Sequence, residues 1–196
     1  MKSLFLLTSL LLAPALLLAS NIIVYAKGDF TVLESGSSAP APAPKEPVKA
    51  KFLATCQADL AQPGPFAVAI KLSAPPEWGK TVPGATGKLD FHDKFSGGFF
   101  VRVALEGLAP RHRYILTLNG NPKLAGNDRL VDAVPGMDTE RYFDFLTITT
   151  DADGRYAATF GIALPTGPYD VRFYVKDTDD FKIVLYHDYF KFAVAQ

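Results

Sequence analysis

The chain has 196 residues, of which 20 are basic and 20 acidic, so its formal net charge is zero. That balance excludes the strongly positive surface that nucleic-acid binding requires. The length is enough for one mid-sized domain with an ordinary core, plus appended segments. The only cysteine, Cys56, rules out an intrachain disulfide, and we expect a buried thiol there. The 15 Phe and 8 Tyr exceed what one small core needs, which indicates an additional apolar contact surface.

Residues 1–26 form an apolar N-terminal segment. The run from Leu4 to Ala26 is almost uncharged, and as an α-helix it would span about 34 Å, enough to cross a hydrocarbon core of about 30 Å. Lys2 precedes the run, which predicts a cytoplasmic N-terminus and export of the remainder. Two interpretations stay open. A retained inner-membrane anchor is favoured by the spanning length and by Tyr25 at the expected interface, whereas a signal peptide would be cleaved after Ala26.

Residues 27–51 are predicted to link this segment to a folded domain over residues 52–196. Within the linker, Ser35–Lys51 alternates Ala and Pro and has no apolar periodicity. Such a composition favours polyproline II, which would give a semi-rigid spacer on the order of 40–50 Å. The spacer either remains a tether or becomes ordered against a partner subunit.

The segment 52–196 shows short alternating apolar runs separated by turn residues, without an amphipathic helical stretch. This pattern predicts an all-β fold, an antiparallel sandwich of the immunoglobulin-like or Greek-key type with about eight strands. The predicted strands are Phe52–Leu60, Phe66–Ser73, Gly98–Leu108, Arg113–Asn119, Tyr142–Thr150, Arg155–Leu164, Tyr169–Lys176 and Phe181–Val194.

Two local features refine this prediction. Gly154 follows Asp151 between two alternating runs, where a tight hairpin would need a positive φ. The last run, Phe181–Val194, is apolar at both odd and even positions, which predicts a strand covered on both faces or lying under a partner. His187-Asp188 is predicted to be a bulge that shifts its alternation.

Two connections are long, Ala74–Gly97 and Gly120–Arg141, and long loops in compact domains often carry function. Trp78 is the only tryptophan, and it is either a contact anchor or a lid over one end of the sandwich. The acidic residues of the second loop are either a calcium site or a solvated loop; they are Asp128, Asp132, Asp138 and Glu140. The predicted partner contacts are Trp78, Phe91 and Phe95 in the first loop, and Leu130, Val131 and Met137 in the second.

The segment Glu106-Gly107-Leu108, followed by the strand Tyr114–Leu118, resembles the copper/zinc superoxide dismutase family and the related chordin-type sandwich domains. Those families place a Gly-Leu pair before a short corner and then a strand with alternating histidines. The resemblance implies a sandwich fold, but Leu116 and Leu118 stand where that strand carries its copper ligands. The segment Thr150–Val171 also resembles immunoglobulin-like and transthyretin-like extracellular sandwiches, which are mostly binding or structural modules.

The chain has three histidines, His92, His112 and His187, on separate segments, so we predict no metal and no cofactor. A Gly-rich phosphate loop, a Gly-x-Ser-x-Gly elbow and a Cys/His nucleophile pair are absent from the sequence, so we expect no enzymatic activity. The leading hypothesis is a membrane-anchored periplasmic or extracytoplasmic accessory subunit that stabilises a membrane complex, of a respiratory or photosynthetic kind. One alternative is a secreted binding module for a small molecule, glycan or surface polymer, and another is a dismutase-like metalloprotein.

Overall fold

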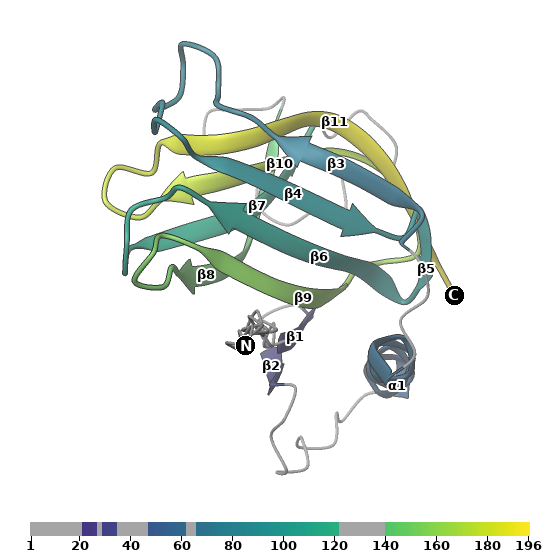
Figure 1. Cartoon of the computed structure of the whole chain (residues 1–196). Helices are drawn as coiled ribbons and strands as arrows, with labels where there is room; N and C mark the ends of the chain where they lie inside the picture. Colours follow the sequence, from purple (N-terminus) through teal and green to yellow (C-terminus); the bar gives the residue numbers. More distant parts are fainter. Residues whose placement is uncertain (1–20, 27–28, 35–46, 62–65, 122–139) are drawn as a thin grey trace, which may run out of the picture.

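The computed structural model describes residues 21–26, 29–34, 47–61, 66–121 and 140–196. They form two β-sheets packed face to face, with one helix beside them (Figure 1). Sheet A has the strand order β2-β1-β9-β6-β4-β3, and sheet B has the order β5-β11-β10-β7-β8. The elements are β1 (Asn21–Ala26), β2 (Asp29–Glu34), α1 (Pro47–Ala61), β3 (Val68–Leu72), β4 (Thr86–Phe91), β5 (Lys94–Ser96), β6 (Gly98–Glu106), β7 (Arg113–Gly120), β8 (Arg141–Thr149), β9 (Tyr156–Ala163), β10 (Gly167–Asp177) and β11 (Ile183–Ala195).

The prediction of an all-β sandwich is confirmed. In sheet A, β6 and β9 are antiparallel neighbours, although the two strands between them in the chain, β7 and β8, belong to sheet B. The pairings β1–β9 and β5–β11 are parallel, and the other pairings between the described strands are antiparallel. The chain therefore passes from one sheet to the other and back, which places residues distant in sequence around one core.

The core lies between the sheets and is filled by alternate residues of each strand. In β6, Phe99, Val101 and Val103 point inward and are 0% exposed. From sheet B, Leu116 and Leu118 of β7 belong to the same cluster and are also 0% exposed. Burying each such side chain stabilises the fold by about 1.5–3 kcal/mol. The two positions at which the resembling family would place metal ligands thus carry core leucines.

A tyrosine holds the corner between β6 and β7. The Tyr114 phenol oxygen accepts a hydrogen bond from the Ala109 amide at 3.0 Å, and the Thr150 hydroxyl donates to the Ala109 carbonyl at 2.6 Å. A tyrosine at a strand start that bonds back to the backbone a few residues upstream is the tyrosine corner found in other β-sandwiches. The Thr150 hydroxyl also accepts a hydrogen bond from the His112 amide at 3.0 Å, so His112 is held at the same corner.

Gly154 has a φ of 71°, so the predicted positive φ is confirmed. A Cβ atom there would lie 2.0 Å from the Leu108 carbonyl oxygen, which excludes larger residues. The predicted hairpin is wrong, because β8 lies in sheet B and β9 in sheet A, so the turn crosses between sheets. The Asp151 carboxylate accepts hydrogen bonds from the amides of Asp153 and Arg155 and closes this turn.

The pairing of β11 with β10 shifts register twice. One shift separates the pairs Val171↔Phe190 and Phe173↔His187, which confirms the bulge predicted at His187-Asp188. The other lies between Val175 and Lys176. Because each bulge moves the inward phase by one residue, apolar residues of both parities reach the same core. Cover on both faces was therefore the wrong explanation for this pattern.

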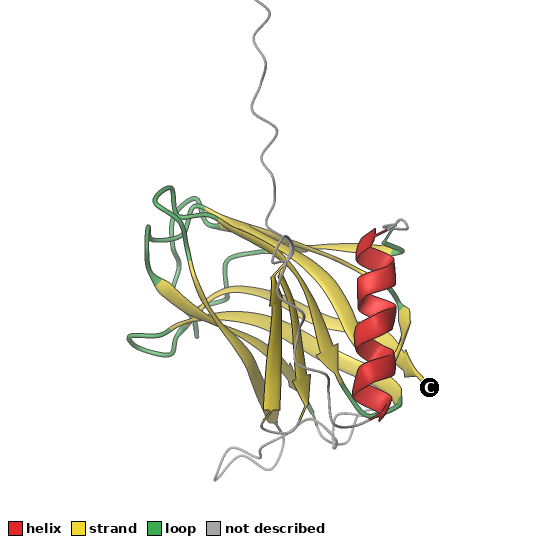
Figure 2. Cartoon of the chain, turned by 90° about the horizontal axis from the view of Figure 1, so that it is seen from below, coloured by secondary structure: helices red, strands yellow, loops and turns green. Residues whose placement is uncertain are grey.

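The predicted strand Phe52–Leu60 is wrong, since these residues lie in helix α1. Figure 2 shows the helix alongside the strands. Phe52, Leu53 and Cys56 are buried, and together with Phe100 of sheet A and Phe95 of β5 they form a second apolar cluster outside the main core. Positions i, i+1 and i+4 share one face of a helix, and proline at the first helical position is favourable.

Two glycines let α1 approach the sheet closely. A Cβ atom at Gly98 would lie 2.6 Å from the Phe52 ring, and one at Gly161 would lie 2.8 Å from the Cys56 sulfur. The Asp59 carboxylate lies 3.2 Å from Nε2 of His92, which adds a polar contact between helix and sheet. The domain thus carries a third, helical layer on sheet A.

The segments predicted before residue 52 are described only in part. The linker predicted over residues 27–51 overlaps β2 and the first residues of α1, while 35–46 lie outside the described residues. Of the predicted membrane segment, residues 21–26 form β1, and 1–20 lie outside the described residues. Among the helices of the described chain, none combines the length and the apolar composition needed to cross a bilayer.

The first long connection is shorter than predicted because it contains β4 and β5. Leu89 and Phe91 point inward in β4 and are 0% exposed, while Lys88 and Asp90 alternate with them and form an ion pair at 2.7 Å. This alternation was the missed signal.

Candidate functional site

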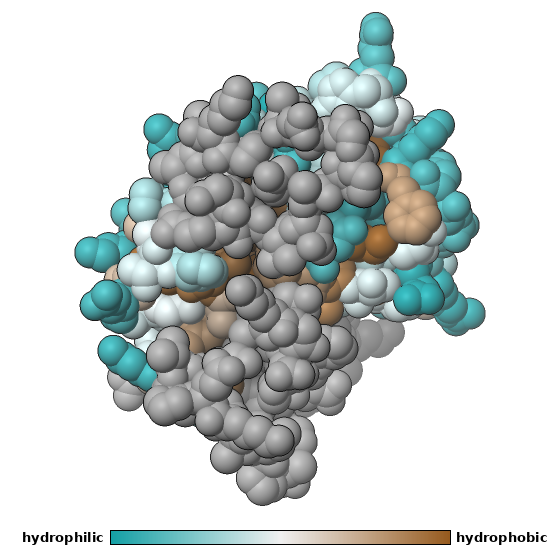
Figure 3. All heavy atoms as spheres, turned by 180° about the vertical axis from the view of Figure 1, so that it is seen from behind, coloured by the Kyte–Doolittle hydropathy of each residue, from teal (hydrophilic) through white to brown (hydrophobic). Residues whose placement is uncertain are grey.

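A pocket of about 330 Å³ lies between the outer face of sheet B and the loop that follows β3. Four of its eight lining residues are Trp or Tyr, and two more are an oppositely charged pair. The lining residues are Pro76, Trp78, Tyr142, Arg172, Tyr174, Ile183, Tyr186 and Asp188. Figure 3 shows the face opposite to that of Figure 1, where brown hydrophobic residues lie next to teal hydrophilic ones.

Strand alternation places these side chains outside the core. In β10, Val171, Phe173 and Val175 point into the core, so Arg172 and Tyr174 point to the outer face. Tyr174 is paired directly with Tyr186 of β11, so the two rings lie side by side on one face. The floor of the pocket is therefore set by sheet register.

The loop carrying Trp78 is fastened to β11. Ser73 and Tyr186 exchange two backbone hydrogen bonds of 2.9 Å, and the Lys80 amide donates to the Ile183 carbonyl at 2.8 Å. Gly79 is required there, since a Cβ atom would lie 2.3 Å from the Pro75 ring. Both ends of the short segment around Trp78 are thus held, which fixes one wall of the pocket.

The Trp78 side chain remains accessible, with 55% of its surface exposed. Its ring centre lies 5.5 Å from that of Tyr186, nearly perpendicular to it, and 6.1 Å from that of Tyr174. These are the spacings of favourable aromatic pairs. Trp78 therefore presents a supported, exposed ring, as expected of a contact anchor.

Arg172 supplies the positive charge. Its Nε donates to the Asp188 carboxylate at 3.1 Å, its Nη1 donates to Glu140 at 3.2 Å, and its guanidinium lies 4.2 Å from the centre of the Tyr189 ring. Burial raises the pKa of Tyr174 to about 12, although Arg172 partly opposes this. The phenol is therefore neutral at physiological pH, and the charges of Arg172 and Asp188 offset each other within the lining.

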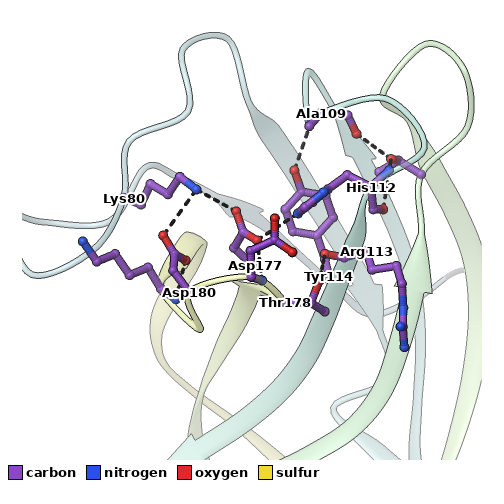
Figure 4. A network of polar contacts seen from close by, with 11 residues as sticks. Lys80, Ala109, His112, Arg113, Tyr114, Asp177, Thr178 and Asp180 are labelled. Carbon is purple, nitrogen blue, oxygen red and sulfur yellow. Dashed lines mark hydrogen bonds and ion pairs between the residues drawn. The ribbon is translucent and has the colours of Figure 1, made fainter.

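A second polar cluster lies at one end of the sandwich and centres on Asp177. In Figure 4, Lys80 and His112 approach this carboxylate from opposite sides, at 2.7 and 2.8 Å. Burial by itself would raise the pKa of Asp177, but hydrogen bonds from Lys80, the Asp179 amide and His112 outweigh it and lower the pKa to about 2. The cluster joins the Trp78 loop, the tyrosine corner and the end of β10.

This cluster is poorly suited to a metal ion. Ligand atoms of His112, Asp177 and Asp179 lie within 4.8 Å of one another. The Lys80 ammonium already bonds Asp177, so a cation there would meet a like charge. His92 lies near Asp59, and His187 lies 2.9 Å from the Lys71 carbonyl oxygen, so the three histidines occupy separate environments.

The predicted contact residues divide into three groups. Trp78 lies in the pocket wall. Phe91 and Phe95 lie in β4 and β5 and are only 0% and 9% exposed, so their predicted placement in a loop was wrong, while their contact with a partner stays a prediction. The remaining three, with the acidic residues 128, 132 and 138, lie outside the described residues; the three are Leu130, Val131 and Met137.

Sequence reasoning missed the other pocket residues. Tyr142, Tyr174 and Tyr186 each occupy an outward position of a predicted strand, where small polar residues would be usual, and this was the available signal. Comparisons with protein-family models, with curated proteins and with solved structures give no match. The geometry of the pocket is therefore the basis for assigning a function.

Proposed function

We propose that this protein is a non-enzymatic extracytoplasmic β-sandwich that binds a ligand in the aromatic pocket around Trp78. The observation that carries the proposal is the pocket itself, in which an exposed tryptophan is supported by two tyrosines and accompanied by an Arg–Asp pair. A concave site with aromatic walls and a few convergent polar groups is the usual form of a small-ligand site. The proposal takes up the binding-module alternative from the sequence and assigns its ligand to this pocket.

Trp78 makes the proposal directly testable, because it is the only tryptophan in the chain. Its emission reports on the pocket without labelling. We would titrate the full chain with representatives of several ligand classes, namely neutral sugars, carboxylates, quaternary ammonium ions, nucleotides and short peptides. At least one class should change the emission with a saturating dependence on concentration.

Calorimetry with two variants then localises the binding. Trp78→Ala should weaken binding of the active class at least about tenfold, because the main aromatic wall is lost. Phe181→Ala is the matched control. Phe181 is 65% exposed and precedes the pocket residue Ile183 by two positions, but it is not among the lining residues. Equal losses in both variants, or no saturable response to any class, would refute the proposal.

The strand connections support a finer proposal for the fold, a Greek-key sandwich of the immunoglobulin-like or dismutase-like kind. Its support is the passage from β6 through β7 and β8 of the other sheet to β9, which lies beside β6. The proposed setting is the membrane surface, with residues 1–26 as an anchor or cleaved leader and the sandwich outside the cytoplasm. Intact-mass measurement separates the two, since cleavage would leave Lys27 as the first residue.

A second candidate function is the accessory subunit of a membrane complex. The observation that favours it is a pair of exposed aromatic side chains, Trp78 and Phe181, on neighbouring loops. The loops are joined by Lys80, whose amide donates to Ile183 and whose ammonium lies 3.4 Å from Asp180. Two such anchors side by side suit a protein partner.

The two candidates differ in what Phe181 does. For a protein partner, Trp78→Ala and Phe181→Ala should each reduce co-purification of the same membrane subunits after detergent extraction. For a small ligand in the pocket, only Trp78→Ala should reduce binding. A chain that runs alone and monomeric after extraction would count against the accessory-subunit function.

A further inference from the structure

We propose that the pocket takes an uncharged carbohydrate, with one sugar ring held against the aromatic wall of Trp78. This inference rests on the proposed binding function and specifies its ligand. It follows from three properties of the lining: the balance of its charges, the hydrogen-bonding capacity that it leaves, and the shape of its apolar surface.

The charge balance argues for a neutral ligand. Asp188 lies 3.1 Å from Nε of Arg172, and Glu140 lies 3.2 Å from Nη1, so an anion would have to compete with two carboxylates for the guanidinium. A cation would have to compete with the Arg172 guanidinium for the Asp188 carboxylate. Displacing either partner of a formed pair leaves a charge uncompensated, which is costly. A neutral ligand avoids both costs because it can leave the pair in place.

The polar groups suit hydroxyls. The Asp188 side chain is 71% exposed, and a carboxylate has about four acceptor sites, so it can accept from ligand hydroxyls while it holds Arg172. The phenols of Tyr142 and Tyr174 have raised pKa values, chiefly through burial, and stay protonated at neutral pH. A phenol both donates and accepts, as a sugar hydroxyl does. A purely apolar ligand would make no use of this remaining hydrogen-bonding capacity.

The apolar surface suits a ring. Trp78 and Tyr186 meet nearly edge to face, at an interplanar angle of 78°, which forms a corner rather than a flat platform. One face of a sugar ring carries mainly C–H bonds and can lie on an aromatic wall by dispersion contacts. At about 330 Å³ the pocket lies at the lower end of the range of ligand sites, which fits one ring with part of a neighbour.

The test compares matched sugars that differ in charge. The full chain is titrated with a panel of neutral mono- and disaccharides containing glucose, galactose, mannose or xylose, and with the corresponding uronic acids and amino sugars. Trp78 emission gives the primary readout and calorimetry the affinity. We expect at least one neutral sugar to bind saturably, and its uronate and amino counterparts to bind at least about tenfold more weakly, because of the pair-displacement cost.

Three variants of the full chain assign the contacts, each checked for folding by circular dichroism. Trp78→Ala should weaken sugar binding about tenfold or more, and Asp188→Asn should weaken it about threefold to tenfold through loss of a charged acceptor. Phe181→Ala should leave affinity within about twofold. Asp188→Asn is suitable because that side chain is mostly exposed and changes the fold little.

The outcomes separate this inference from the proposed function. If no neutral sugar binds while another ligand class binds in a Trp78-dependent manner, the carbohydrate inference is wrong and the binding function stands. A charged sugar that binds more tightly than its neutral counterpart would also overturn the inference. If no class binds at all, both proposals fall.

Discussion

Replacing Asp177 with asparagine tests the polar cluster that joins three loops at the end of the sandwich. Its side chain is 7% exposed, and its pKa is lowered from 3.8 to about 2. At about 1.36 kcal/mol per pKa unit, that shift corresponds to roughly 2 kcal/mol of folding free energy. Lys80 is 42% exposed, so solvent screens its part of the interaction. We therefore expect Asp177→Asn to lower the free energy of unfolding by about 1–2 kcal/mol at pH 7.

The sign of the pH dependence follows from the lowered pKa. A carboxyl group that is more acidic when folded stabilises the protein fully above its unfolded pKa, and that contribution is lost as the pH falls through the folded value. The window for Asp177 therefore runs from about pH 4 down to about pH 2. The difference between the wild type and Asp177→Asn should shrink by about half between pH 7 and pH 3.

Urea unfolding followed by circular dichroism at pH 7 and pH 3 measures both quantities. Asp180→Asn is the control, because Asp180 is 38% exposed and lies 3.4 Å from the same Lys80, and it should change the stability by less than about 0.5 kcal/mol. Equal effects of the two substitutions at pH 7, or a difference that stays constant to pH 3, would show that the cluster does not hold Asp177 ionised.

Three further predictions concern the core and the helix. Tyr114→Phe should lower the free energy of unfolding in urea by about 1 kcal/mol, because it removes the hydrogen bond from the Ala109 amide. Tyr156→Phe removes no such bond in the described structure, so an equal loss of stability in that variant would contradict this prediction. Gly161→Ala should lower the free energy of unfolding by about 1–3 kcal/mol, because the added methyl group would collide with the Cys56 sulfur. In a double-mutant cycle, Cys56→Ala should recover at least about 0.5 kcal/mol of that stability, and additive effects would contradict the contact. The Cys56 thiol is 0% exposed and burial raises its pKa, so Ellman's reagent should label it far more slowly in the native chain than in urea, and immediate native labelling would refute the packing of α1.

Much of the sandwich could be predicted from alternation alone. In β10, three apolar residues at odd positions alternate with polar or amphipathic ones, and a period of two leaves little choice but a half-buried strand. The bulge at His187-Asp188 was predictable for the same reason, because it lies where the phase changes. Pairing between sheets was not, since the turn at Gly154 has the residues of a hairpin but joins strands of different sheets.

Helix α1 shows where the period was misread. The apolar residues Phe52, Leu53 and Cys56 fit a helical face, but a short apolar run is ambiguous between helix and strand. Its neighbours are rich in Ala and Lys, which favours a helix. Gly98 and Gly161, which allow the helix to pack closely on the sheet, lie far from it in the sequence. The packing site of the helix could therefore not be predicted from the local sequence.

The pocket was least accessible to sequence reasoning. Trp78 was identified by its rarity and by its place in a long connection. Its partners Tyr174 and Tyr186 meet only through the pairing of β10 with β11, and Arg172 is positioned next to Asp188 by a bulge. Which residues of neighbouring strands are paired depends on the whole sheet and not on any local motif.

The position of α1 also makes the two outer faces of the domain different from each other. The described strands β1 and β2 extend the edge of sheet A beyond β9, and α1 packs on the outer face of that sheet, whereas Trp78 and its companions lie on the outer face of sheet B. A bound molecule that contacts α1 would therefore leave the pocket on the opposite sheet open to solvent.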